Sequence, residues 1–185
     1  MQYQFTRLDI PDVILVTLKK FGDSRGFFME TYREKVFTEN GIPGSFVQEN
    51  FSKSNKGILR GLHYQMDPYA QGKLVRVVSG SVLDVAVDIR KGSPTFGRHI
   101  AVTLSENEPT MLWEPTGFAH GFAVLEDNTQ FSYKTTDYYH PEVERSILWS
   151  DPELKINWPD MNFNLSEKDK DALCLKDAEN NFIYV

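Results

Sequence analysis

Apolar and polar positions alternate along most of this chain with the two-residue period of half-buried β-strands. Turn residues separate the strand-like segments, and the long apolar run 74–89 is interrupted at Ser79-Gly80-Ser81. The predicted strands cover residues 13–19, 27–32, 46–51, 58–65, 74–78, 82–89, 99–105 and 130–139. We expect two hairpins, one joining 13–19 to 27–32 and the other joining 74–78 to 82–89.

Helices are expected at only two places. Residues 33–40 are followed by Gly41, which suits the left-handed position after a helix, and Ser166 can cap a helix over 166–172. Beyond His140-Pro141 an irregular C-terminal tail should lie over the sheet. Many short strands without repeat or linker predict one all-β domain over residues 1–185, a jelly-roll β-sandwich or barrel with a short C-terminal helical tail.

Charge and composition narrow the class of partner. Apolar residues make up 41% and charged residues 25% of the 185 positions, the balance of a globular protein. The net charge of −6 argues against a general nucleic-acid surface, because affinity for polyphosphate depends on clustered Lys and Arg. The single Cys174 fits a reducing compartment, and no apolar run has membrane-spanning length. We predict a cytoplasmic protein with neither nucleic-acid nor membrane partners.

Reactive side chains concentrate in residues 58–73, ILRGLHYQMDPYAQGK. Alternation places Arg60 and Leu62 on one face of the predicted strand and His63 on the other. His63 is the best general base, because imidazole titrates near neutral pH. Lys73 is the best cation for stabilising an oxyanion beside it. A hydrogen-bonded histidine on a half-buried strand remains the plainer interpretation of His63 alone.

Three further side chains have two interpretations each. Tyr133 suits a proton donor on the side of a pocket opposite the base, or an aromatic residue of the core or rim. Gln48 and Asn50 share a strand face, where their amides would either bind a ligand or finish an exposed edge.

Other reaction types lack support in the sequence. The histidines at 63, 99, 120 and 140 include no pair separated by a single residue, which disfavours a metal site. Phosphate-loop and serine-nucleophile motifs are absent as well. We therefore expect no metal site.

Five ordered motifs resemble the dTDP-4-dehydrorhamnose 3,5-epimerase family. The similarity extends from about Phe5 to Cys174. The motifs are GDSRGFFMETYRE, FVQENFSKSNKGILRGLHYQ, QGKLVRVVSGSVLDVAVDIRKGSPTFG, EPTGFAHGFAVLED and LSEKDKDA. The resemblance implies a cupin-like jelly roll that forms a homodimer, with a strand that reaches the partner. It further implies a cofactor-free isomerase of dTDP-L-rhamnose biosynthesis that converts dTDP-4-dehydro-6-deoxy-D-glucose into dTDP-4-dehydro-L-rhamnose.

The resemblance also implies residue roles. His63 would be the base, Asp169 its orienting carboxylate with Asp171 as the rival, Lys73 the enolate-stabilising cation and Tyr133 the acid. The residues implied to contact the nucleotide-sugar are Arg25, Glu30, Gln48, Asn50, Arg60, Lys73, His120, Glu144 and Lys168. Family members commonly carry His where this chain has Phe51, and Pro where it has Leu173.

Three other functions compete with the double epimerase. A related enzyme would invert only C3 or only C5 of a nucleotide-deoxysugar, a non-catalytic cupin would bind the sugar without exchange, and a cupin oxygenase would hold a metal. A 4-keto group acidifies the protons of both C3 and C5, so one base and one cation suffice for both inversions.

Overall fold

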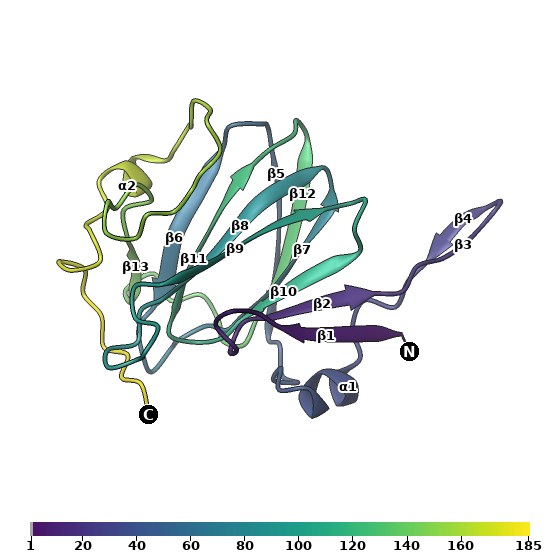
Figure 1. Cartoon of the computed structure of the whole chain (residues 1–185), viewed down its shortest axis with the longest axis horizontal. Coiled ribbons are helices and arrows are strands. Elements are labelled where there is room, and N and C mark those ends of the chain that lie inside the picture. The colour runs from purple at the N-terminus through teal and green to yellow at the C-terminus, as the bar shows by residue number, and fades with distance from the viewer. Residues whose placement is uncertain (1) are drawn as a thin grey trace.

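Two antiparallel sheets packed face to face make up the body of the computed structural model, which describes residues 2–185 (Figure 1). The six-stranded sheet has the order β1 (Tyr3–Arg7), β2 (Ile14–Leu18), β10 (Thr110–Glu114), β7 (Lys73–Ser79), β12 (Thr129–Thr135) and β5 (Gln48–Ser54). The five-stranded sheet has the order β13 (Glu144–Ser146), β6 (Leu59–Gln65), β11 (Phe118–Val124), β8 (Ser81–Asp88) and β9 (His99–Ser105).

Few elements lie outside these sheets. They are the hairpin of β3 (Phe21–Asp23) and β4 (Gly26–Phe28) and the helices α1 (Glu34–Glu39) and α2 (Glu167–Lys170). The predicted all-β jelly roll with a short C-terminal helix is confirmed. Neither helix among residues 2–185 is long and apolar enough to cross a membrane.

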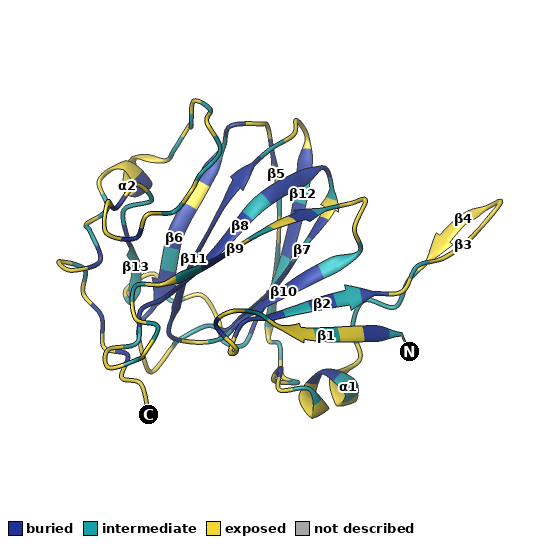
Figure 2. Ribbon diagram, viewed as in Figure 1, coloured by how far each residue is buried: buried dark blue, intermediate teal, exposed yellow. Residues whose placement is uncertain are grey.

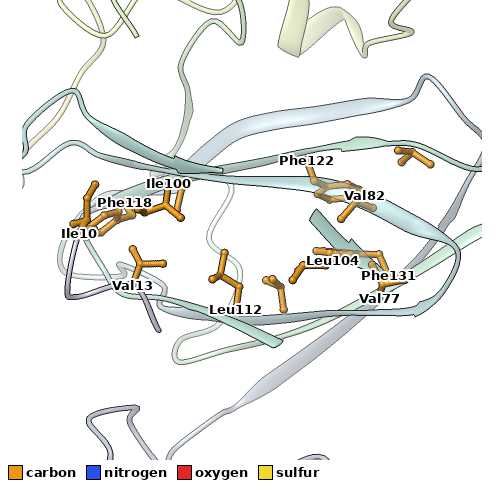
Figure 3. Close-up of a cluster of buried hydrophobic side chains, with 13 residues drawn as sticks. Ile10, Val13, Val77, Val82, Ile100, Leu104, Leu112, Phe118, Phe122 and Phe131 are labelled. Carbon is orange, nitrogen blue, oxygen red and sulfur yellow. The ribbon is translucent and has the colours of Figure 1, made fainter. Parts of the chain in front are cut away.

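The main hydrophobic core fills the space between the sheets (Figure 3). Strand alternation supplies it: Val75 and Val77 project inward from β7, and Phe131 projects inward from β12. Phe118 and Phe122 of β11 meet them from the other sheet. Each such buried side chain stabilises the fold by about 1.5–3 kcal/mol.

Both outer faces are also covered, in part, by the chain itself. The C-terminal tail packs on the five-stranded sheet through Leu154, Leu175 and Phe182, so β11 is buried at every position (Figure 2). On the other side, Phe37 of α1 packs against the outer face of the six-stranded sheet together with Trp113. The predicted covering tail is confirmed.

The first predicted hairpin is wrong. β2 pairs with β1 and β10, and not with residues 27–32. Strand β4 ends at Phe28, and the β3–β4 hairpin projects away from both sheets (Figure 1). The polar appearance of the N-terminal segment concealed β1, in which Tyr3 is buried against Phe37 on the outer face of the six-stranded sheet.

The second predicted hairpin is also wrong, because β7 and β8 belong to different sheets. The chain turns a corner between the layers at Gly80, which has φ +80°. A Cβ atom there would lie 2.3 Å from Thr129 Oγ1, so only glycine fits the corner. Apolar alternation identified both strands, but it does not distinguish a hairpin from a crossover between layers.

Candidate active site

A cavity of about 330 Å³ opens between the two sheets, beside the main core. Both sheets and neighbouring loops contribute to its wall. Eight side chains predicted to act on substrate line it: Gln48, Asn50, Arg60, His63, Lys73, His120, Tyr133 and Glu144. The structure thus gathers residues that are up to 96 positions apart in the chain, from Gln48 to Glu144.

The same alternation that builds the core directs Lys73 and Tyr133 into the cavity. Lys73 is two positions from the core residue Val75 on β7, and Tyr133 lies opposite Val75 on the neighbouring strand β12. Both side chains therefore project from the inner face of the six-stranded sheet. They extend the core face with polar groups at the point where the sandwich opens.

Arg60 and His63 share the cavity, which corrects the prediction that they face opposite ways. The pairing of β6 with β11 shifts register, since His120 pairs with His63 but Phe122 pairs with Arg60. Between these pairs, Gly61 and Leu62 of β6 oppose the single residue Gly121 of β11, as in a β-bulge, and the alternation inverts between Arg60 and His63.

Glycine permits this bulge. Gly61 has φ +125°, and a Cβ atom there would lie 2.4 Å from the Cα atom of Gly121. The two backbones approach closely because both positions lack side chains.

His63 is paired with a buried carboxylate. Its Nε2 atom lies 2.5 Å from Oδ1 of Asp169, whose side chain is 3% exposed. Ser166 caps α2 and donates its hydroxyl to Asp169 Oδ2 at 2.9 Å. Burial opposes ionisation of Asp169, but the hydrogen bond from His63 holds its pKa below the ordinary value. Asp171, the rival from sequence, ends α2 and is exposed.

Lys73 and Tyr133 line the cavity, the first from a buried position and the second from a half-buried one. Lys73 is 8% exposed and donates to the His63 carbonyl at 3.2 Å. Burial lowers the pKa of Lys73 and raises that of Tyr133. Lys73 and the neutral phenol of Tyr133 face His63 from the opposite sheet, which suits removal of a proton on one side and its return on the other.

Polar side chains surround the opening of the cavity. Gln48 donates to Asn50 at 3.1 Å, so both predicted amides occupy one strand face. Glu144 accepts a hydrogen bond from Tyr139 at 2.8 Å and pairs with Lys168 at 2.5 Å. Burial opposes ionisation of Glu144, but Lys168 holds its pKa below the ordinary value. Lys168 thus reaches the site through Glu144.

Arg25 and Glu30 do not reach the cavity of their own chain. Arg25 has an 88% exposed side chain and pairs with Asp23 on the projecting β3–β4 hairpin (Figure 1). Glu30 accepts a hydrogen bond from Tyr3 at 2.5 Å and pairs with Arg33. Their predicted contact with substrate is therefore not formed within one copy of the chain.

Two acidic residues of the site were missed from sequence. Asp84 and Glu114 lie behind His120, fully buried or nearly so. The carboxylate in the apolar alternation Val82, Asp84, Ala86 was the available signal for the first. With His120 they form a group whose ligand atoms lie within 4.8 Å of one another, close enough for a metal. Scanning for closely spaced histidines overlooked this arrangement, which joins three different strands.

Proton transfer at a carbon next to a carbonyl needs a base, a cation for the oxyanion and an acid on the opposite side. This jelly roll contains all three groups in one cavity, which defines an acid–base enzyme of cupin-like fold. The family model described as dTDP-4-dehydrorhamnose 3,5-epimerase matches residues 7–177. The chain belongs to this family of isomerases.

Individual relatives are similar in sequence to this chain over nearly its whole length. The dTDP-4-dehydrorhamnose 3,5-epimerase of Shigella flexneri is 56% identical, covering 94% of this chain and 96% of the relative. That of Pseudomonas aeruginosa is 55% identical, covering 94% and 97%. The crystal structure of the Legionella pneumophila epimerase in complex with dTDP-4-keto-L-rhamnose has a TM-score of 0.91 and 50% identity, covering 94% and 93%.

Proposed function

We propose that this enzyme inverts C3 and C5 of dTDP-4-dehydro-6-deoxy-D-glucose to give dTDP-4-dehydro-L-rhamnose, in dTDP-L-rhamnose biosynthesis. The observation that carries the proposal is the His63–Asp169 pair facing Lys73 and Tyr133 across one cavity. High identity to epimerases of that name over more than nine tenths of the chain supports it.

The chemistry uses one set of groups at both carbons. Asp169 holds one ring nitrogen of His63, and the other takes the proton from the carbon next to the C4 ketone. The electron pair of the broken C–H bond moves to the C4 oxygen, where the ammonium of Lys73 stabilises the enolate. Tyr133 then protonates the carbon from the opposite face, which inverts its configuration.

The opening of the cavity suits a nucleotide-sugar. Arg60 supplies a fixed cation for a diphosphate, and its Nη2 donates to Ser54 at 3.3 Å. Gln48 and Asn50 offer uncharged hydrogen-bonding edges, while Glu144 and Lys168 close the other side. The Legionella relative, crystallised with a dTDP-sugar, supports this class of ligand.

A homodimer would complete the site. The β3–β4 hairpin exposes Phe27 and Phe28, 62% and 67% respectively, and carries Arg25 beyond the body of its own chain. An exposed apolar projection of this kind is suited to packing against another copy. Arg25 and Glu30 would then contact the substrate of the partner. The single free Cys174 supports a cytoplasmic location.

The test is incubation with dTDP-4-dehydro-6-deoxy-D-glucose, followed by NMR of the sugar ring. The proposal predicts a product of L-rhamno configuration. A product inverted at one carbon alone would mark a mono-epimerase, and recovery of unchanged substrate would mark a sugar-binding cupin without activity.

A further inference from the structure

Four titratable side chains meet behind the inner wall of the cavity, at the boundary between the sheets. Glu114 of β10 lies directly opposite Lys73 of β7 in the six-stranded sheet. Asp84 of β8 and His120 of β11 approach from the five-stranded sheet. All four are at most 8% exposed. The reaction described above gives no role to Asp84 or Glu114.

Three carboxylate oxygens in this cluster lack a hydrogen-bond donor. His120 Nε2 lies 3.1 Å from Asp84 Oδ2 and 3.3 Å from Glu114 Oε1, and only the contact with Asp84 has hydrogen-bond geometry. Within residues 2–185, no protein group donates to Asp84 Oδ1 or to either oxygen of Glu114. An ionised Glu114 would be a buried charge beside a second carboxylate, which is strongly unfavourable.

We propose that Glu114 is protonated and that its carboxylic acid O–H donates a hydrogen bond to Asp84, so that the two carboxyl groups carry one negative charge and position Lys73 and His120. A single proton turns one Glu114 oxygen into a donor and gives the free oxygen of Asp84 a partner, which accounts for two of the three oxygens. Glu114 is thereby a positioning residue, since its side chain does not line the cavity.

Electrostatics favours this arrangement. Burial and the neighbouring charge of Asp84 raise the pKa of Glu114 well above its ordinary value. Burial lowers the pKa of His120, and a neutral imidazole has only one N–H to share. The remaining negative charge balances the ammonium of Lys73, which burial would otherwise deprotonate more readily.

The inference rests on the proposed function for its kinetic consequence. Lys73 stabilises the enolate only while it is protonated. The groups that act on it from the cluster are Glu114, Asp84 and His120, and it also donates to the carbonyl of His63. Glu144 and Lys168 act on it from the cavity side with opposite charges. A second negative charge at Glu114 would draw the ammonium away from the C4 oxygen. The shared proton limits that attraction, so the cation stays available to the substrate.

The protonation state can be measured without any assay of epimerisation. The carbonyl stretch of a carboxylic acid lies at higher frequency than the stretches of a carboxylate. At pH 7, infrared spectra of the whole protein should contain one such band, shifted in D2O and absent from Glu114→Gln. If Glu114→Gln does not fold, wild-type protein alone is compared in H2O and D2O. Absence of the band would overturn the proposal, whatever the outcome for substrate.

Kinetics then test the positioning role. Gln matches the shape and donor of a protonated Glu, so Glu114→Gln should restore most of the activity that Glu114→Ala loses. We expect kcat to fall at least about tenfold in Glu114→Ala with KM changed less, and to stay within about threefold in Glu114→Gln. Equal losses in both variants would show that a charge at Glu114 is required and would overturn the proposal.

A metal ion bound by Asp84, Glu114 and His120 is the competing explanation for this cluster. Elemental analysis of purified wild-type protein, and of protein equilibrated with Zn²⁺ or Mn²⁺ and then desalted, decides between them. The proposal predicts no stoichiometric metal. One equivalent in wild type that is lost in Glu114→Gln would overturn it.

Discussion

His63 Nε2 and Asp169 Oδ1 lie 2.5 Å apart, although 106 positions of chain separate the two residues. An ionised carboxylate only accepts hydrogen bonds, so it fixes a proton on the ring nitrogen that faces it. The other nitrogen keeps the lone pair that a base needs. Helix α2, capped by Ser166, thereby sets the protonation pattern of a side chain on β6.

Removal of the base should abolish most of the activity. We expect His63→Ala to lower kcat by about 10²- to 10⁴-fold, the usual contribution of a general base. His140→Ala is the matched control, because His140 pairs with Glu142 outside the cavity. Substrate consumption followed by NMR measures both. Normal turnover in His63→Ala would assign the base to another residue.

The Asp169 carboxylate should stabilise the fold in a pH-dependent way. Burial raises and the hydrogen bond from His63 lowers its pKa, with a net decrease. A depressed folded pKa contributes stability that is complete above the ordinary aspartate value of about 3.9 and is lost as pH falls through the folded value. Urea unfolding of wild type and Asp169→Asn should therefore differ most at neutral pH and converge in acid.

Asp171→Asn is the control for that experiment. Asp171 lies on the same short segment, is exposed and has no contact with His63. We expect its free energy of unfolding to follow wild type within about 0.5 kcal/mol at every pH. A difference for Asp169→Asn that stays constant down to pH 3 would contradict the pairing.

Lys73 should act on turnover more than on binding. Lys73→Met keeps much of the side-chain volume but removes the charge, so we expect kcat to fall about 10²- to 10³-fold. Lys134→Met is the control, because Lys134 lies opposite Leu74 on the outer face and pairs with Glu49 at 2.7 Å. Steady-state kinetics separates the parameters. A change in KM alone would reduce Lys73 to a binding residue.

Substitution of Gly61 in the bulge should lower the free energy of unfolding. Alanine at Gly61 must adopt φ +125° and place its Cβ 2.4 Å from Gly121 Cα. We expect a cost above about 3 kcal/mol, combining backbone strain with a clash that cannot relax easily. Gly92→Ala shares the positive φ but has nothing within 4 Å, and should cost about 1–2 kcal/mol. Equal costs in urea unfolding would show that the close approach is unimportant.

Local pattern predicted strands such as β2, in which buried and half-buried residues alternate. Residues 99–105 form β9 as expected, and Ser166 caps α2 as expected. The pairing of strands was harder to predict, because alternation indicates which side chains are buried but not which strand lies alongside. The two hairpins failed for this reason, and β13 was missed because its three residues are all half-buried.

The sequence predicted some site residues correctly and missed those that depend on contacts between strands. His63, Lys73 and Tyr133 converge as the resemblance implied. The side of the strand on which Arg60 lies depends on a register shift between β6 and β11, which no single segment encodes. Glu114 was missed because its neighbours Asp84 and His120 come from the opposite sheet.

Deuterium incorporation from D2O shows which carbons of the sugar lose and regain a proton in the active site. If one base serves both carbons next to the C4 ketone, NMR of the dTDP-sugar recovered after turnover should show deuterium at C3 and at C5. Both positions should remain protonated when His63→Ala replaces the wild type. Deuterium at only one carbon, or undiminished exchange in His63→Ala, would contradict double inversion with His63 as the base.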